Sequence, residues 1–441
     1  MPGFPIERIH HQIENELSIF CSQLNKLEVE TYPTKRCLDI INHLREKVED
    51  YRSKKRSIMD QVDDNPDEAA RKLISHIHNP LVQQDVKFLD WLRGAQTQNV
   101  PWSVIPCIEH LSRKIIPEHK LLTYCAYYYN YAISWSLSER LAPYPYTVLS
   151  LPRLHRTNLL WHTLVGHEIF HPCCAEFINK HNQNALSKIT QQLRESDELF
   201  RGLEEERIER ISGPIHLAWR RATEELLCDM ACVELFGPAG ILTMRAFAAC
   251  SSLDDMPSPT NNFYPPWRYR FEVVWENSID IQKLDSIYSN CSNSEIMECF
   301  KQDMESFGKL VSSQEGAALV DRHPQAKIAY KQVKNLLPAA SKFVKESLPG
   351  TLCRWHSQRV LNQIPKLLER LEKGIPPNEI ILEVDETTQK QKYETQSAEL
   401  PAILIAGWIY ETYWQKKYTA NGEIMPYETM SRLLLKACED I

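Results

Sequence analysis

Residues Leu154 to Lys180 read LHRTNLLWHTLVGHEIFHPCCAEFINK, and we expect the fold to form around this stretch. Within it, Leu160, Leu164, His167 and His171 are spaced by four, three and four residues, which is the spacing of one face of an α-helix. Side chains four residues apart lie one turn apart on that face, so two imidazoles can reach one metal ion at about 2.0–2.1 Å. The stretch therefore predicts a helix that carries two neighbouring histidines towards a core or a cleft.

The five residues HEIFH, from His167 to His171, also match the H-E-x-x-H pattern of zinc hydrolases. In that pattern the glutamate, here Glu168, lies beside the metal and holds the water that attacks the substrate. A pair of core histidines on a buried helix, without a metal, is the alternative interpretation. Pro172 follows directly and cannot donate a helical hydrogen bond, which predicts that the helix ends or kinks there.

A catalytic zinc ion usually has three protein ligands, so the motif needs a further residue from elsewhere in the chain. Residues 214–236 (PIHLAWRRATEELLCDMACVELF) have the pattern of an amphipathic helix, and we predict Glu225 in this segment as the third ligand. Asp229 lies one turn later on the same face. Its carboxylate can accept a hydrogen bond from the free ring nitrogen of His167 or His171, which would fix the tautomer that presents the other nitrogen to zinc.

Glu224 is the competing candidate for the third ligand. Its neighbour one turn later is Cys228, which supplies no carboxylate, so the spacing favours Glu225. Acidic residues that follow arginines on a helix can also form surface ion pairs, and this alternative stays open. The cysteines of the segment are themselves at metal-ligand spacing, although small buried thiols need no metal to explain them.

The sequence HEIFH followed by EELLCD resembles the gluzincin metallopeptidases, in which H-E-x-x-H lies on one helix and a glutamate, often within E-x-x-x-D, lies on a second. The resemblance covers residues 146–237. It implies a zinc-dependent hydrolase of peptide bonds with a zincin-like helical core. It also implies that His167, His171 and Glu225 are the Zn²⁺ ligands and that Glu168 is the general base.

The chemistry of such a site requires one further group. Zinc lowers the pKa of a water molecule towards about 7, and Glu168 can accept its proton and pass it to the leaving amine. The oxyanion that develops needs an additional hydrogen-bond donor. The segment NFYPPWRYRF, residues 262–271, offers four candidates for this donor, namely Tyr264, Arg268, Tyr269 and Arg270. The alternative interpretation of this segment is a helix start with exposed arginines.

The rest of the chain predicts a mainly α fold with a minor β part. Residues 6–29 and 34–62 have helical periodicity and are expected to pair as a hairpin, and helices are expected at 67–78 and 86–94. Residues 144–152 are expected to be extended, and Tyr146 to Leu151 could pair with an extended substrate backbone. We divide the chain into an N-terminal helical region (1–100), the zincin-like core (101–290) and a C-terminal helical region (291–441).

Composition sets limits on the class of protein. The 441 residues contain 43% hydrophobic and 25% charged residues, which is ordinary for a globular chain with a sizeable core. The net charge of -7 is spread along the chain, so we expect no nucleic-acid partner. No apolar run is long enough for a membrane helix and the start lacks a secretory signal, so we expect a cytoplasmic protein that does not bind membranes.

Three functions are therefore compared. The first is a cytoplasmic zinc metallopeptidase that cleaves proteins or peptides, with an endopeptidase favoured over an exopeptidase. Because such an enzyme must not digest its own cell, narrow specificity or an activating partner is expected. The second is a catalytically silent zincin-like helical protein that acts as a partner-binding module. The third is a metal-free helical scaffold.

Overall fold

The computed structural model describes residues 6–62, 65–126, 131–134, 146–195, 204–249, 251–255, 257–259, 263–291, 294–383, 393–421 and 427–439. The fold is mainly helical, with 76% helix and 6% strand, which confirms the predicted fold class. The chain forms two compact units. The first contains residues 1–105 and 118–156, and the second contains residues 106–117 and 157–441. The three predicted regions stay a prediction, and the two units are described separately.

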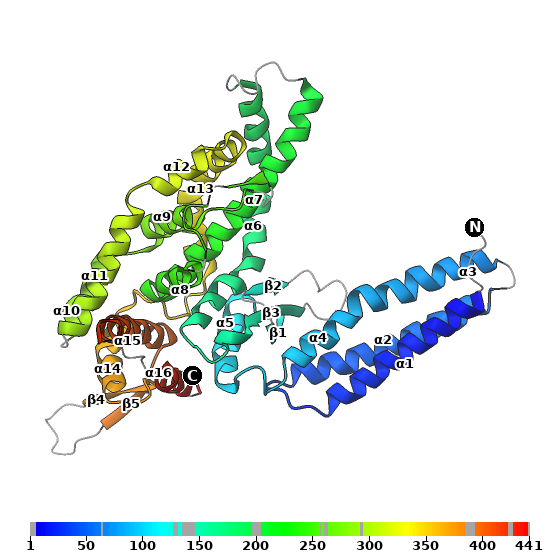
Figure 1. Cartoon of the computed structure of the whole chain (residues 1–441), viewed down its shortest axis with the longest axis horizontal. Coiled ribbons are helices and arrows are strands. Elements are labelled where there is room, and N and C mark those ends of the chain that lie inside the picture. The colour runs from blue at the N-terminus through cyan, green and yellow to red at the C-terminus, as the bar shows by residue number, and fades with distance from the viewer. Residues whose placement is uncertain are drawn as a thin grey trace. The chain divides into compact units, whose positions relative to one another are not determined.

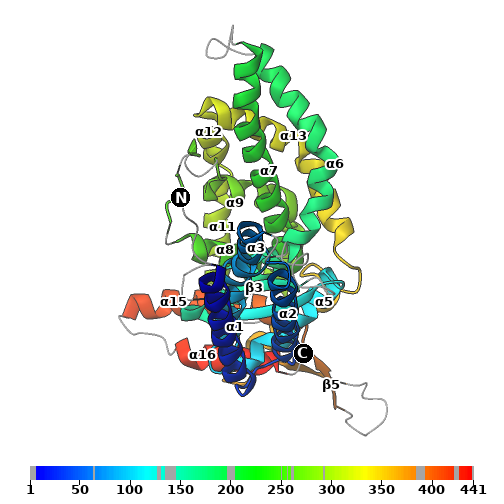
Figure 2. The ribbon, with the colours of Figure 1, turned by 90° about the vertical axis from the view of Figure 1, so that its right-hand side faces the viewer.

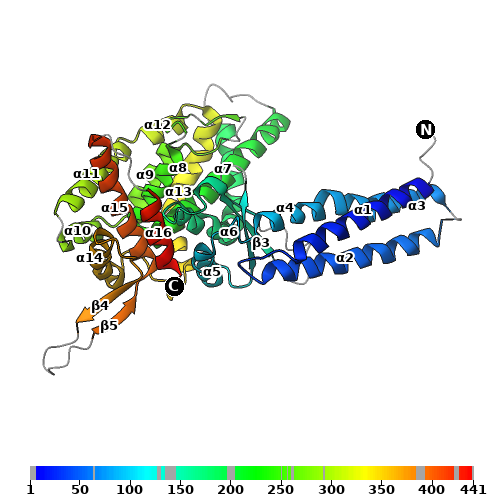
Figure 3. The same ribbon diagram turned by 60° about the horizontal axis from the view of Figure 1, so that its bottom comes forward.

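The first unit is built on a bundle of long helices (Figure 3). Helix α1 (Ile6–Glu28) and helix α2 (Arg36–Met59) form the predicted hairpin. The third member runs without a break from α3 (Pro66–Leu73) to α4 (Val86–Gly94), through two π-helical segments at Ile74–His78 and Leu81–Asp85. Two separate helices were expected here, so the structure differs from the prediction in joining them.

The π-helical segments explain how the third helix stays in the bundle. Its core-facing residues are Ala69, Leu73, Ile77, Leu81 and Asp85, all buried and all four positions apart. At 3.6 residues per turn, a spacing of four would drift by about 40° at each step. The wider π turns take up this drift and keep the stripe on one face.

Asp85 is the polar member of this stripe. It is buried, and its carboxylate accepts hydrogen bonds from the Nζ atom of Lys47 at 2.5 Å and from the hydroxyl of Tyr51 at 2.7 Å. Both partners belong to α2. The two hydrogen bonds therefore fix the third helix against the hairpin at a defined rotation.

The first unit also contains a three-stranded sheet, formed by β1 (Lys120–Ala126), β2 (Ala132–Ser134) and β3 (Tyr146–Pro152). Strand β3 lies in the centre, parallel to β1 and antiparallel to β2. Its residues 148–150 are paired on both sides, so an extended substrate cannot pair with them. The predicted docking of a substrate backbone along Tyr146 to Leu151 is therefore wrong for this part of the strand.

The second unit is dominated by two long helices that lie side by side and antiparallel, α6 (Val165–Glu195) and α7 (Glu205–Phe236) (Figures 1 and 2). Helix α13 (Pro324–Ser347) packs against both. The remaining helices of this unit are α5 (Ile105–Ile115), α8 (Pro238–Ala248), α9 (Trp267–Ser278), α10 (Ile281–Asn290), α11 (Ser294–Val311), α12 (Glu315–Asp321), α14 (Gln358–Glu372), α15 (Leu400–Asn421) and α16 (Tyr427–Cys438).

Strands β4 (Glu379–Glu383) and β5 (Tyr393–Ser397) form an antiparallel pair in the second unit. None of the helices in the described residues is both long and apolar enough to cross a membrane.

The sequence predicts that the helix ends or kinks at Pro172, and the first of these alternatives is wrong, because α6 continues to Glu195. A proline inside a helix costs about 3 kcal/mol locally, so packing on both sides of it must compensate. The ring of Phe343, on α13, lies 6.4 Å from the ring of Phe170 before the proline and 5.2 Å from that of Phe177 after it. One neighbouring helix thus holds both halves of α6.

Candidate metal site

The first two turns of α6 carry His167, Glu168 and His171, and all three side chains are largely buried against α7. The rings of the two histidines are 5.0 Å apart and inclined at 77°. Gly166 allows this close packing, because a Cβ atom at that position would lie 2.7 Å from the ring of Phe236 at the end of α7. The absence of a side chain there lets the start of α6 lie directly against α7.

Each histidine is held through its Nδ1 atom by a carboxylate of α7. The Nδ1 atom of His167 lies 2.9 Å from Oδ1 of Asp229, and the Nδ1 atom of His171 lies 3.0 Å from Oε1 of Glu224. In a neutral imidazole, a carboxylate at Nδ1 places the hydrogen on that nitrogen and leaves the lone pair on Nε2. Both imidazoles are therefore arranged to use Nε2 as the ligand atom.

Two further carboxylates lie on the Nε2 side of the rings. Oε2 of Glu225 is 3.5 Å from Nε2 of His167, and Oε2 of Glu168 is 3.9 Å from Nε2 of His171. Both side chains are only partly exposed. The structure thus brings the predicted ligand Glu225 and the predicted general base Glu168 to the same side of the two histidines.

Sequence reasoning missed the role of Glu224. The spacing makes Glu224 a competitor of Glu225 for the metal, whereas in the structure its carboxylate binds the Nδ1 atom of His171. Asp229 binds the corresponding atom of His167, as the E-x-x-x-D spacing predicted. The sequence feature that could have indicated this role is the pair of adjacent glutamates, Glu224 and Glu225. Neighbouring residues on α7 can reach opposite sides of the two imidazole rings.

A buried arginine from α9 completes the charged cluster. The Nε and Nη2 atoms of Arg270 each donate to Asp229 at 2.7 Å, and Nη2 lies 3.3 Å from Oε2 of Glu225. The guanidinium also lies 4.1 Å from the ring centre of Trp267. Because Asp229 is 0% exposed and Arg270 is 3% exposed, this ion pair is shielded from water.

The cluster sets the charge of each member. Burial acts to raise the pKa values of Glu225 and Asp229, but His167 and Arg270 outweigh it and lower both. Burial acts to lower the pKa of His167, but Asp229 and Glu225 raise it to about 10. Burial raises the pKa of Glu168 against the opposing effect of the two histidines. Glu168 is thus the carboxylate of this group that gains basicity.

The four candidates for the oxyanion donor separate into two pairs. Arg270 lies in the cluster, and its Nη1 atom donates to the hydroxyl of Tyr264 at 3.0 Å. Arg268 instead forms ion pairs with Asp254 and Glu315, and Tyr269 packs edge-on against another tyrosine ring 5.1 Å away. Successive residues of a helix point about 100° apart, so only one of residues 268–270 can face α7. The structure therefore brings Tyr264 and Arg270 to the site, and not Arg268 or Tyr269.

The donor set on the Nε2 side fits zinc, because two imidazole nitrogens and one carboxylate oxygen are the ligands of many catalytic zinc sites. Among the described residues, the group whose ligand atoms all lie within 4.8 Å of one another is His167, His171 and Cys228. Burial raises the pKa of the Cys228 thiol well above its usual range, and its Sγ atom lies 3.5 Å from that of Cys174. Zinc deprotonates a thiol that it binds, so this pKa does not exclude Cys228, which competes with Glu225 for the third ligand position.

Comparisons of the chain with protein-family models, with curated proteins and with solved structures found no match.

Proposed function

We propose that this protein is a zinc-dependent metallopeptidase of the gluzincin type, in which Zn²⁺ binds to Nε2 of His167, Nε2 of His171 and a carboxylate oxygen of Glu225. One observation carries the proposal: both Nδ1 atoms are bound by carboxylates, while Glu225 and Glu168 lie near the Nε2 atoms. Two core histidines without a metal would need no such common orientation. Zinc in this position would supply a Lewis acid that polarises a peptide carbonyl and acidifies a water molecule.

The residues of the chain have separate roles in this proposal. Glu168 accepts the proton of the attacking water at its carboxylate and returns it to the nitrogen of the leaving amine. Burial suits Glu168 to this exchange, because a raised pKa makes its carboxylate a better base. Asp229 and Glu224 hold the two imidazoles in one tautomer, and Arg270 keeps Asp229 and Glu225 ionised.

Tyr264 is the group we assign to hydrogen bonding with the substrate. Burial raises its pKa well above the usual range, so its hydroxyl stays protonated at neutral pH and can donate to a carbonyl oxygen. The contact with Arg270 Nη1 fixes the position of the hydroxyl oxygen. Arg270 therefore acts as a positioning residue for Tyr264.

The metal is tested by elemental analysis of the purified chain. We expect about one zinc per chain in the wild-type protein and its loss in His167→Ala. A zinc-free protein that takes up no zinc in titration contradicts the proposal and favours a metal-free scaffold. Zinc that is retained in Glu225→Ala and lost in Cys228→Ser would instead identify the site that contains the thiol.

The reaction is tested by comparing new protein termini in cells that express the wild-type protein or Glu168→Gln. This variant keeps the volume of the side chain and is expected to retain zinc but to lose cleavage. Glu176→Gln, an exposed position on the same helix, is the matched control and should cleave like wild type. Identical sets of termini for all three proteins would favour a catalytically silent partner-binding module.

A further inference from the structure

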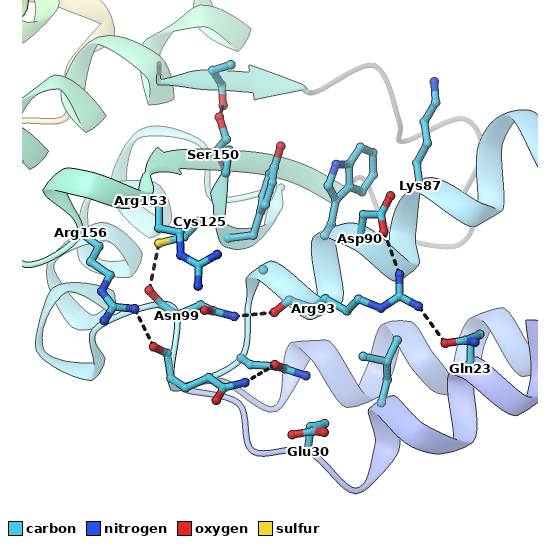
Figure 4. Close-up of a pocket in the computed structure, with 18 of the residues that line it drawn as sticks. Gln23, Glu30, Lys87, Asp90, Arg93, Asn99, Cys125, Ser150, Arg153 and Arg156 are labelled. Atoms are coloured by element: carbon cyan, nitrogen blue, oxygen red, sulfur yellow. Dashed lines mark hydrogen bonds and ion pairs between the residues drawn. The ribbon is translucent and has the colours of Figure 1, made fainter. Parts of the chain in front are cut away.

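The first unit contains a cavity of about 1270 Å³ that the proposed peptidase function does not use (Figure 4). It lies between helices α1 and α4, the segment after α4, the sheet and the residues that follow β3. Ligand sites commonly occupy about 300–1,000 Å³, so this cavity has room for a ligand of ordinary metabolite size.

The sheet and α4 give the cavity an aromatic wall. Tyr124, Ser150 and Ala132 lie side by side on adjacent strands, and all three line the cavity. The ring of Trp91 on α4 lies 6.3 Å from that of Tyr124, and both side chains are partly exposed. Gly94 ends α4 against β1, where a Cβ atom would lie 2.9 Å from the Tyr124 ring. The close approach of helix and strand thus fixes the position of the Tyr124 ring.

The lining is strongly basic, although the whole chain has a net charge of -7. The charged side chains of the described lining are five cations and two carboxylates, namely Lys26, Lys87, Arg93, Arg153 and Arg156 with Glu30 and Asp90. A cavity with this excess of positive charge attracts an anionic ligand.

Two arginines lie together at one end of the cavity (Figure 4). Arg153 and Arg156 both come from the turn that follows β3, and Figure 4 shows both near Cys125. The Nη1 atom of Arg156 donates to the backbone oxygen of Gln98 at 2.7 Å, which orients its guanidinium group. Guanidinium groups bind phosphate in a bidentate manner, and two of them can bind a di- or triphosphate.

We propose that this cavity binds a nucleotide, with its phosphates at Arg153 and Arg156 and its base stacked on Tyr124 or Trp91. An acidic peptide would also match the charge, but it would leave the aromatic wall without a stacking partner. Base stacking on an aromatic side chain contributes about 1–3 kcal/mol, which favours a ligand that has both a phosphate and a ring. The proposal is independent of the zinc site and of peptidase activity.

The test is a fluorescence anisotropy titration of the full chain with an ADP analogue that carries a fluorescent methylanthraniloyl group. We expect saturable binding that unlabelled ADP displaces, with pyrophosphate and adenosine as weaker competitors. Arg153→Gln and Arg156→Gln should each weaken binding about tenfold, because each removes a charge-assisted hydrogen-bond donor. Lys72→Gln, a partly exposed position on α3 paired with Glu68 and outside the cavity lining, should bind like wild type.

Several outcomes would overturn the proposal. One is the absence of saturable binding, and another is unchanged affinity in the double variant of Arg153 and Arg156. If pyrophosphate competes as well as ADP, the ring contributes nothing and the nucleotide assignment is wrong. If hexaglutamate displaces the probe as well as ADP does, the cavity is a peptide site. Tyr124→Leu tests the stacking of the base, because it removes the Tyr124 ring and keeps both arginines for the phosphates.

Discussion

The buried ion pair between Asp229 and Arg270 makes a specific prediction about stability. Asp229→Asn keeps the shape of the side chain but removes its charge. The guanidinium of Arg270 then keeps the carboxylate of Glu225 as a partner, at 3.3 Å. Breaking a buried pair by removing one partner costs about 3–5 kcal/mol. Because Glu225 and the new amide oxygen retain part of the interaction, we expect a loss of about 3 kcal/mol, at the lower end of that range.

Differential scanning calorimetry in the presence of EDTA measures this loss without a contribution from bound metal. At an unfolding entropy of about 2.1 cal/mol/K per residue, about 3 kcal/mol in a unit of about 300 residues corresponds to a midpoint lower by about 5 °C. Glu206→Gln is the control on the same helix, because its exposed pair with Arg210 should contribute less than about 1 kcal/mol. If the two variants unfold within about 2 °C of each other, the ion pair does not stabilise the unit by the expected amount.

A double variant that also removes Arg270 separates the contribution of the ion pair from the cost of burying an arginine charge. Arg270→Met in the Asp229→Asn background removes the buried guanidinium that has lost the charge of Asp229, so the double variant should recover part of the lost stability. Additive losses in the double variant would show that the two charges are not coupled.

Three further predictions follow from other groups. Because the pKa of His167 is raised to about 10, zinc must displace a proton from this residue in order to bind. The apparent zinc affinity, measured by chelator competition, should therefore rise about tenfold per pH unit from pH 7 to 9. An affinity that does not change with pH would show that zinc displaces no proton from His167. Burial acts to raise the pKa of Glu234, but His356 and Arg354 lower it, so its stabilisation is present above about pH 4.5 and is lost as pH falls through the lowered pKa. Glu234→Gln should therefore cost roughly 1–3 kcal/mol at pH 7 in urea unfolding, and this difference from wild type should shrink below pH 4; a difference independent of pH would contradict the assignment. Gly166→Ala should destabilise the second unit by about 1–3 kcal/mol in urea unfolding, because the Cβ atom of the alanine would overlap the Phe236 ring. An unchanged stability would show that the ring can move away.

The sequence predicts those parts of the site that depend on spacing within one helix. His167 and His171 share a face because they are four residues apart, and Asp229 reaches the Nδ1 atom of His167 from the face that it shares with Glu225. Whether the cluster binds zinc and cleaves peptides remains a prediction that the experiments above address.

Features that depend on how helices dock were not predictable in the same way. The choice between Arg268 and Arg270 follows from the rotation of α9 against α7, and local sequence does not determine that rotation. The role of Glu224 likewise follows from the position of α6 beside α7. The continuation of α6 beyond Pro172 depends on Phe343, which is distant in sequence. Tertiary contacts outweighed local preference at each of these positions.

The π-helical segments of the third bundle helix have a consequence for changes in chain length. Each segment accommodates about one residue more than an α-helical turn would, so deleting one residue from Ile74–His78 could leave an unbroken helix. The four residues left would turn the chain by about 400° as an α-helix, close to the rotation of the five π-helical residues, so Asp85 would stay beside Lys47 and Tyr51. We therefore expect this helix to tolerate the loss of one residue within a π-helical segment far better than a loss in its α-helical parts before Asp85, which would turn Asp85 away by about 100°.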